Sequence, residues 1–386
     1  MSGPEIQAIC PRQLFDGQQW LQQHALVIDQ AHIQAVLPTA DLPSDIPVQE
    51  LDGRLAPGFI DLQVNGGGGV MFNRAPNPEG LSLITAGHRS RGTTSLMPTV
   101  ISDTAAITRQ CVNAVSTAKE QGNASLLGIH IEGPFFDVSR RGTHKAEMIR
   151  AMEDEDLMWL TSLQDFPVIL TLAPEQTQNG QIRQLAGAGI FVCAGHTDAT
   201  YEQLQAALVD GLKGFTHLFN AMSQLTGRAP GAVGAALDNS ESWIGIIADG
   251  HHVHSANIRI TQRAKPDGKL LLVSDAMSTV GSTDTFIDIY GERIELQGGR
   301  LVNAEGNLAG SAIGMIDAVR HCHLEVKLEL EECLRMASLY PATFLGLEQQ
   351  LGRLAPGYRA DIVHFDTDYH VRDTWVAGQH QQHSIL

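Results

Sequence analysis

Cysteine is sparse in this chain, and the cysteines that are present form no recognisable pairs. The five cysteines among the 386 residues are scattered, without a CxxC pair: Cys10, Cys111, Cys193, Cys322 and Cys333. This spacing fits neither a disulfide framework nor a zinc knuckle, so we expect reduced and mostly buried thiols. Reduced thiols are typical of cytoplasmic proteins, and we expect this location.

Basic charge and long apolar runs are lacking as well. The formal net charge is -17, which argues against a nucleic acid or an anionic membrane as the partner. No apolar run approaches the length of a membrane span, and the first residues do not have the pattern of a secretory signal. A small anionic ligand remains compatible with this charge, provided that Arg, His or backbone N–H groups are placed locally to bind it.

The chain is long enough for one large domain with a full core and a small second domain. From residue 58 onward, short apolar runs alternate with helical patterns, which indicates buried parallel strands joined by helices. Eight such runs occur: 59–64, 94–100, 126–133, 167–174, 190–196, 214–219, 243–250 and 269–276. Helical patterns lie between them, for example at 104–122 and at 200–211, where Thr200 and Gln203 form a capping-box pattern.

Eight strand–helix units over about 250 residues are the size of a (β/α)8 barrel of the TIM type. We therefore predict an α/β fold with such a barrel over 55–353, and we keep a doubly wound sheet as the second choice. The strand-like segments 1–54 and 354–386 predict a small β-sandwich domain built from both chain ends. Residues 286–310 read as hairpins inserted after the eighth strand, in the role of a lid or of a dimer contact.

Polar side chains occur at the ends of six of these eight strands. Chemistry in a TIM-type barrel takes place at the carboxyl ends of the strands, so these side chains are candidates for an active site. They are Gln63 and Asn65, Glu132, His196, His217, Asp249 with His251 and His252, and Asp275.

Glu132, His196 and His217 together form a possible ligand set for a catalytic metal ion. Two imidazoles, one carboxylate and a water molecule make an open zinc site, and such an ion polarises a carbonyl and lowers the pKa of its water. Asp275 would take a proton from this water and pass it to the leaving group. For any one of these residues a hydrogen-bonded side chain at the barrel rim is the simpler interpretation, and only the whole set favours a metal site.

Four motifs carry a resemblance to a known family: HIEGPF (130–135), GHTDA (195–199), THLFNAM (216–222) and SDAM (274–277). In this order they resemble the N-acetylglucosamine-6-phosphate deacetylases of the amidohydrolase superfamily. The resemblance extends over essentially the whole chain, including the flanking β-domain and the GxRAD motif of the tail. It implies a metal-dependent enzyme of amino-sugar recycling that hydrolyses N-acetylglucosamine 6-phosphate to glucosamine 6-phosphate and acetate.

The resemblance also implies roles for individual residues. Glu132, His196 and His217 match the metal ligands of the family, and Asp275 matches the aspartate that acts as base and then as acid. His144, in the RGTHKAE motif, matches a histidine that helps to polarise the acetyl carbonyl.

A second set of residues matches the groups that hold the sugar phosphate. These are Asn220 and Ala221, through their backbone, together with Arg228 and His252. Family members are homodimers in which the arginine that matches Arg228 reaches into the neighbouring subunit's site. An acidic protein that binds a phosphate dianion does need a guanidinium and backbone donors there. Without the resemblance, Arg228 reads as a surface charge after a loop.

The stretch GFIDLQVNGGGG (58–69) departs from a pattern found in many amidohydrolases. These enzymes place HxH at the end of the first strand as ligands of a first metal, whereas this chain has Gln63 and Asn65, and amides bind zinc poorly. The fourth strand also lacks the lysine that bridges two metals in some relatives. We predict one divalent ion per chain, with Gln63 and Asn65 orienting water or neighbouring side chains. We expect Zn²⁺, and Fe²⁺, Co²⁺ or Mn²⁺ also suit these ligands.

Two alternatives stay open at this point. One is a different amidohydrolase that acts on another N-acyl or cyclic amide, against which Arg228 and the HLFNAM motif speak. The other is a non-catalytic sugar-phosphate sensor, which predicts the loss of a metal ligand or of the base. The three possible metal ligands, Glu132, His196 and His217, and the possible base, Asp275, are all present.

Overall fold

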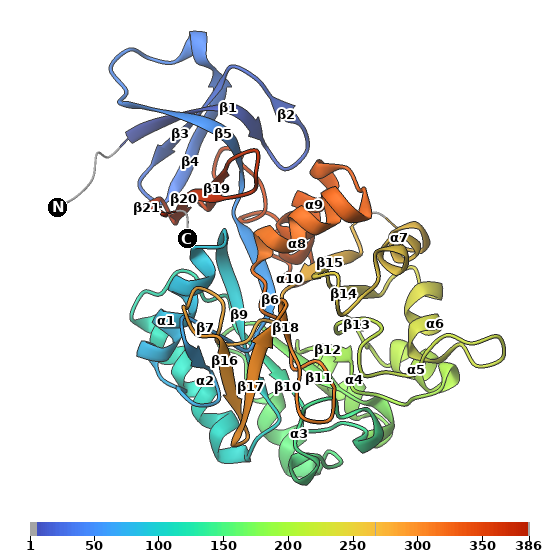
Figure 1. Cartoon of the computed structure of the whole chain (residues 1–386). Helices are drawn as coiled ribbons and strands as arrows, with labels where there is room; N and C mark the ends of the chain where they lie inside the picture. Colours follow the sequence, from blue (N-terminus) through green and yellow to red (C-terminus); the bar gives the residue numbers. More distant parts are fainter. Residues whose placement is uncertain (1–5, 267, 385–386) are drawn as a thin grey trace.

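The computed structural model describes residues 6–266 and 268–384, and its larger part is a barrel of eight parallel strands (Figure 1). In barrel order the strands are β6 (Phe59–Val64), β9 (Thr93–Ile101), β10 (Ile129–Glu132), β11 (Val168–Leu172), β12 (Phe191–Ala194), β13 (Gly214–Phe215), β14 (Trp243–Ile247) and β15 (Leu270–Val273). The two ends of this sheet meet where the backbone nitrogen of Asp275 donates to the carbonyl oxygen of Gln63 at 2.9 Å. The predicted barrel and its eight strands are confirmed.

Helices cover the outside of this barrel. They are α1 (Pro78–Arg89), α2 (Ala105–Glu120), α3 (Asp154–Thr161), α4 (Gln181–Gly187), α5 (Tyr201–Val209), α6 (Gly231–Asp238), α7 (Ser255–Ala264), α8 (Met315–His321), α9 (Leu330–Ala337) and α10 (Leu339–Leu345). The predicted capping box begins α5: Thr200 Oγ1 accepts from the nitrogen of Gln203 at 3.3 Å, and Gln203 Oε1 accepts from the nitrogen of Thr200 at 2.8 Å. None of the helices in the described part of the chain has the length and apolar character needed to cross a membrane.

Burial explains why the barrel strands read as continuous apolar runs rather than as alternating ones. Every residue of β6, β9, β10 and β11 is buried, because one face of each strand fills the barrel and the other faces the helices. Short turns connect the longer elements: η1 (Thr39–Asp41), η2 (Val138–Arg140), η3 (Ala146–Met148), η4 (Pro174–Gln176) and the π-helical η5 (Cys322–Val326).

Both ends of the chain contribute to a second, mostly antiparallel sheet beside the barrel (Figure 1). Its strands are β1 (Ile6–Phe15), β2 (Trp20–Leu21), β3 (His24–Asp29), β4 (His32–Pro38), β5 (Val48–Pro57), β19 (Ile362–Phe365), β20 (Val371–Val376) and β21 (Gln379–Gln382). β5 joins the two halves, because it pairs with β1 on one side and with β19 on the other. Residues 1–5 and 385–386, which the sequence assigns to the same domain, lie outside the described residues.

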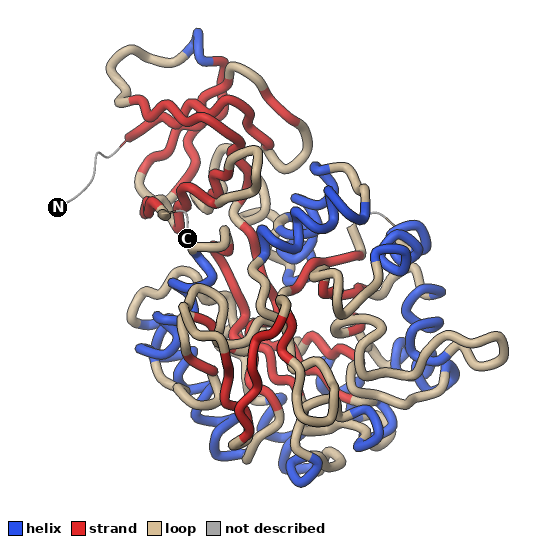
Figure 2. Tube along the Cα trace, in the orientation of Figure 1, coloured by secondary structure: helices blue, strands red, loops and turns tan. Residues whose placement is uncertain are grey.

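The predicted hairpins after the eighth strand are also present. They are β16 (Phe286–Ile289), β17 (Glu292–Gln297) and β18 (Arg300–Leu301), and Figure 2 shows them as separate red segments over the barrel. Apolar side chains of these strands share a buried cluster with residues that follow or end barrel strands: Ile287, Ile289, Ile294 and Leu301 with Met71, Ile101 and Met277. Two further short strands, β7 (Gly66–Gly67) and β8 (Val70–Met71), form the turn after β6.

Candidate active site

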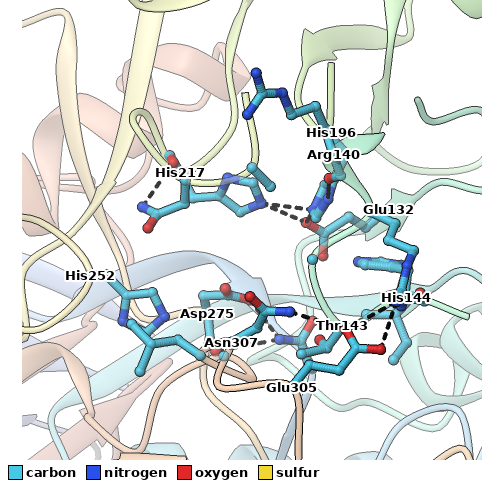
Figure 3. A pocket seen from close by; sticks show the side chains of 18 of the residues that line it. Glu132, Arg140, Thr143, His144, His196, His217, His252, Asp275, Glu305 and Asn307 are labelled. Carbon is cyan, nitrogen blue, oxygen red and sulfur yellow. Dashed lines mark hydrogen bonds and ion pairs between the residues drawn. The ribbon is translucent and has the colours of Figure 1, made fainter. Parts of the chain in front are cut away.

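A cavity of about 600 Å³ lies at the carboxyl ends of the barrel strands, and most of the residues predicted for the site line it (Figure 3). The predicted residues in its wall are Asn65, Glu132, His144, His196, His217, Asn220, Ala221, His252 and Asp275. Gln63 lies just beneath, hydrogen-bonded to two of them. Arg228 is exposed in the loop between β13 and α6 and is not part of the wall.

Glu132, His196 and His217 converge on one point of this cavity. Glu132 is the last residue of β10, and each histidine stands two residues after its strand, β12 or β13. Oε1 of Glu132 lies 3.1 Å from Nε2 of His217 and 3.4 Å from Nε2 of His196, and the two Nε2 atoms are 3.1 Å apart. Ligand atoms of a tetrahedral zinc site, with bonds of about 2.0–2.1 Å, lie about 3.3 Å apart. The three side chains therefore fit a single divalent ion.

Unusual backbone conformations aim three of these side chains into the cavity. His196, His217 and Asp275 have φ angles of 49°, 33° and 52°. This left-handed region costs a residue with a side chain about 1–2 kcal/mol, and such residues concentrate at functional sites.

The imidazole of His196 is oriented from behind by the loop that follows β10. Its Nδ1 donates to the carbonyl oxygen of Arg140 at 2.9 Å, which leaves the lone pair of Nε2 directed at the cavity. The ring of Phe136 stacks on the imidazole with centroids 4.3 Å apart. The guanidinium of Arg140 pairs with Asp198 at 2.7 Å, so the two loops are tied together beside His196.

Burial and mutual hydrogen bonding shift the pKa values of this group. Burial raises the pKa of Glu132, but its contacts with the imidazoles of His196 and His217 outweigh burial and hold this pKa well below its usual value. For His217, burial lowers the pKa and the hydrogen bond and charge of Glu132 raise it, with a net increase. For His196, burial prevails and lowers the pKa. An ionised carboxylate beside a neutral His196 is what a metal ligand set requires.

Asp275 faces this group across the amide side chains of Asn65 and Gln63. Nδ2 of Asn65 donates to Oδ1 of Asp275 at 2.6 Å, and Nε2 of Gln63 lies 3.0 Å from Oε1 of Glu132 and 3.2 Å from Oδ1 of Asp275. Burial, followed by the charge of Glu132, raises the pKa of Asp275 to about 6. Both amides present a nitrogen, which is a donor, to the carboxylates.

His144 completes the wall with an imidazole whose tautomer is determined by Ser102. The backbone N–H of Ser102 donates to Nδ1 of His144 at 3.3 Å, and the hydroxyl of Ser102 lies 2.9 Å from the same atom. Because Nδ1 accepts, the neutral ring carries its proton on Nε2. Burial, followed by the charge of His196, lowers the pKa of His144 to about 3, so the ring is neutral at ordinary pH.

The opposite side of the cavity carries His252, Asn220 and Ala221. Nδ1 of His252 donates to Oδ2 of Asp249 at 2.6 Å, which leaves Nε2 of the ring free for another partner. Burial raises the pKa of Asp249, but the hydrogen bond from His252 outweighs it and the net shift is downward. Ala221 has a φ of 50° in the HLFNAM loop, and its carbonyl oxygen accepts from the nitrogen of Thr197 at 3.2 Å.

Reasoning from the sequence missed four residues around this cavity: Ser102, Arg140, Arg141 and Glu305. Ser102 follows β9 directly, and it could have been found by extending the search for polar residues to every strand end. Arg140 acts through its carbonyl oxygen, which no sequence pattern reveals. Glu305 comes from the inserted hairpins and forms an ion pair with Arg141 at 2.8 Å.

Comparisons with known proteins agree with this geometry. The family model described as amidohydrolase family matches residues 54–382, and the model of the NagA composite domain matches residues 7–55. An N-acetylgalactosamine-6-phosphate deacetylase of Shewanella sp. (strain ANA-3) is 41% identical over 88% of this chain and 86% of its own length. An N-acetylglucosamine-6-phosphate deacetylase of Haemophilus influenzae is 35% identical over 93% of this chain and 95% of its own length.

Solved structures show the same architecture. The crystal structure of N-acetylglucosamine-6-phosphate deacetylase from Pasteurella multocida superposes with a TM-score of 0.94 at 36% identity, over 98% of this chain and 100% of that chain. A mutant of the enzyme from Mycobacterium smegmatis, in complex with N-acetyl-D-glucosamine-6-phosphate, has a TM-score of 0.89 at 28% identity, over 98% of this chain and 99% of that chain.

Proposed function

The chain belongs to the amidohydrolase family, and we propose that it hydrolyses the acetamide of N-acetylglucosamine 6-phosphate to glucosamine 6-phosphate and acetate. The observation that carries this proposal is the convergence of Glu132, His196 and His217 opposite Asp275 and His144 in one cavity. The curated relatives that share most of the chain's length are deacetylases of amino-sugar 6-phosphates. A second candidate substrate is the C4 epimer, because the Shewanella relative at 41% identity acts on N-acetylgalactosamine 6-phosphate.

We propose that Glu132, His196 and His217 hold one divalent ion, of which Zn²⁺ is the first candidate and Fe²⁺, Co²⁺ and Mn²⁺ are others. When bound, such an ion supplies Lewis-acid polarisation of a carbonyl and activation of water. Asn65 and Gln63 donate to the carboxylates of Asp275 and Glu132, which supports their role in orienting the base and one ligand rather than in binding a second ion.

Asp275 is the proposed proton carrier. Its carboxylate accepts a proton from the attacking water and then donates this proton to the amino nitrogen as the C–N bond breaks. A pKa raised to about 6 suits both steps near neutral pH, because the carboxylate is ionised before the attack and becomes an effective acid once protonated. The hydrogen bond from Asn65 holds Oδ1 in place for this transfer.

His144 is proposed to polarise the acetyl carbonyl as a neutral donor. Its Nδ1 accepts from Ser102, so Nε2–H is available to a carbonyl oxygen in the cavity. A donor that is positioned before the reaction stabilises the negative charge that develops on this oxygen.

The phosphate is proposed to lie at the His252 side of the cavity, held by His252 and by the backbone of Asn220 and Ala221. Arg228 is exposed and outside the wall of its own cavity, which supports a role at the site of a second subunit in a homodimer. In this arrangement each subunit completes the phosphate site of the other.

Acetate release from three sugars tests this proposal: N-acetylglucosamine 6-phosphate, its C4 epimer and unphosphorylated N-acetylglucosamine. We expect rapid release from a phosphorylated sugar and slow release from the unphosphorylated one. Release from an unrelated N-acyl or cyclic amide alone would instead favour a different amidohydrolase. Tight binding of the phosphorylated sugar without any release would favour the sensor.

A further inference from the structure

We propose that the inserted hairpins, residues 286–310, position His144 for catalysis through two side chains, Tyr290 and Glu305. This inference rests on the proposed role of His144 in the reaction. In this proposal the hairpins support the position of one catalytic group. The two side chains approach the support of His144 from different directions.

The first contact runs through Ser102. The hydroxyl of Tyr290 donates to the carbonyl oxygen of Ser102 at 2.6 Å, and the N–H and hydroxyl of Ser102 both contact Nδ1 of His144. Tyr290 therefore holds the residue that determines which nitrogen of His144 carries the proton. The contact is part-buried and joins residues 188 positions apart in the chain.

The geometry of the hairpin turn brings Tyr290 to this place. Tyr290 and Gly291 link β16 to β17 in a two-residue turn, with φ angles of 52° and 86°. Such turns match the twist of an antiparallel pair, but their first position usually holds Asn, Asp or Gly. A side chain is disfavoured in this left-handed conformation, and the hydrogen bond to Ser102 is a reason for the presence of tyrosine here.

The second contact runs through Arg141. Nη2 of its guanidinium donates to both carboxylate oxygens of Glu305, at 2.8 and 3.0 Å, and Nη1 donates to the carbonyl oxygen of His144 at 3.2 Å. Arg141 thus connects the backbone of His144 to the loop after β18. Residues 141–144 form a turn outside any helix or strand, so side-chain contacts of this kind determine where the imidazole lies.

The hairpins are anchored well enough to serve as such a support. Ile287, Ile289 and Leu301 are buried in the cluster that includes Ile101, the last residue of β9. Ser102 follows Ile101 directly. The apolar contacts thus hold the hairpins against the same strand end that carries the serine.

Tyr290→Phe is the direct test, because it removes only the hydroxyl. We expect kcat for acetate release to fall about tenfold, the effect of one lost part-buried hydrogen bond, with KM and bound metal unchanged. Tyr358→Phe is the matched control. The hydroxyl of Tyr358 also donates to a backbone carbonyl oxygen, that of Glu348 at 2.8 Å, but neither residue lines the cavity. The control should keep the wild-type kcat.

A double-mutant cycle shows whether the effect passes through His144. In a His144→Asn background, Tyr290→Phe should cause no further loss of kcat, because the group that it positions is gone. A Glu305→Gln variant should lose less kcat, because its ion pair with Arg141 is half exposed, and it too should cause no further loss in the His144→Asn background. Its control is Glu295→Gln, which removes another exposed ion pair of the same hairpins. Additive losses in the cycle would overturn the proposal.

Nitrogen-15 chemical shifts of His144, assigned by their absence in the Asn variant, give a readout that does not need activity. Tyr290→Phe should change the shifts of Nδ1 and Nε2, whereas Tyr358→Phe should leave them unchanged. Unchanged shifts together with an unchanged kcat would overturn the inference while the proposed reaction stands. If the wild-type protein released no acetate from any of the sugars, the proposed function would fail, and the shifts would still decide whether the hairpins position His144.

Discussion

The side-chain nitrogen of Asn65 lies 2.6 Å from Oδ1 of Asp275. Gln63, near the end of β6 and two residues before Asn65, donates to the same oxygen and to Glu132. These are the positions at which many amidohydrolases carry metal-binding histidines. In this chain the end of the first strand instead provides hydrogen-bond donors, and these fix a carboxylate that is suited to proton transfer.

Asn65→Ala should therefore impair the base without removing the metal. The hydrogen bond from Asn65 lowers the pKa of Asp275 against the raising effects of burial and Glu132, so its loss should raise this pKa. Because the base must be ionised, the acid limb of the kcat profile should move to higher pH, and kcat at neutral pH should fall about tenfold. Metal content measured beside the pH profile is the control. An unmoved acid limb would show that Asn65 does not support the base.

Arg228→Ala should weaken the binding of a phosphorylated sugar. A guanidinium in contact with a phosphate contributes about 1.5–3 kcal/mol, so we expect KM for N-acetylglucosamine 6-phosphate to rise about tenfold to hundredfold. The slow reaction of the unphosphorylated sugar should not change. Arg183→Ala, which removes an arginine that pairs with Asp210 on the barrel surface, is the control. Equal effects on the two sugars would place Arg228 outside the phosphate site.

The stability of the fold should decrease at mildly acidic pH because of His88. This buried histidine donates from Nε2 to the carbonyl oxygen of Gly66 at 2.9 Å, and burial lowers its pKa from 6.5 to about 4. The unfolded chain therefore binds a proton between pH 6.5 and 4 that the folded chain does not bind. The contribution of His88 to the free energy of unfolding is therefore complete above pH 6.5 and decreases by about 3 kcal/mol as the pH falls to 4.

His88→Gln keeps a donor for Gly66 but cannot titrate in this range. Urea unfolding at pH 7 and at pH 5 should show a smaller loss of stability for the variant than for the wild-type protein. The same loss in both proteins would mean that other groups cause the acid sensitivity.

The barrel and the convergent group of possible metal ligands are predictable from the sequence because both follow from local patterns. The eight apolar runs predict eight strands, and parallel strands bring their carboxyl ends together, so the sequence alone predicts that Glu132, His196 and His217 lie near one another. Even β13, which has only two residues in the structure, was marked by its apolar run and the histidine that follows it.

The supports of the site were not predictable in the same way. Ser102 and Tyr290 meet across 188 positions, and Arg140 contributes a carbonyl oxygen that every residue possesses. The turns in the sequence predict the hairpins, but their position over the loop that carries His144 depends on a buried cluster shared with the barrel. Contacts of this kind follow from the packing of the whole chain, and no single segment encodes them.

The most direct test of this account is a titration of metal-stripped protein with Zn²⁺, in which bound metal and acetate release from N-acetylglucosamine 6-phosphate are measured together. We expect activity to rise in proportion to bound ion and to reach its maximum at about one ion per chain. Asp275→Asn should bind the same amount of ion while its turnover falls about a hundredfold or more. Activity that follows a second ion, or an Asp275→Asn protein with wild-type turnover, would contradict the account.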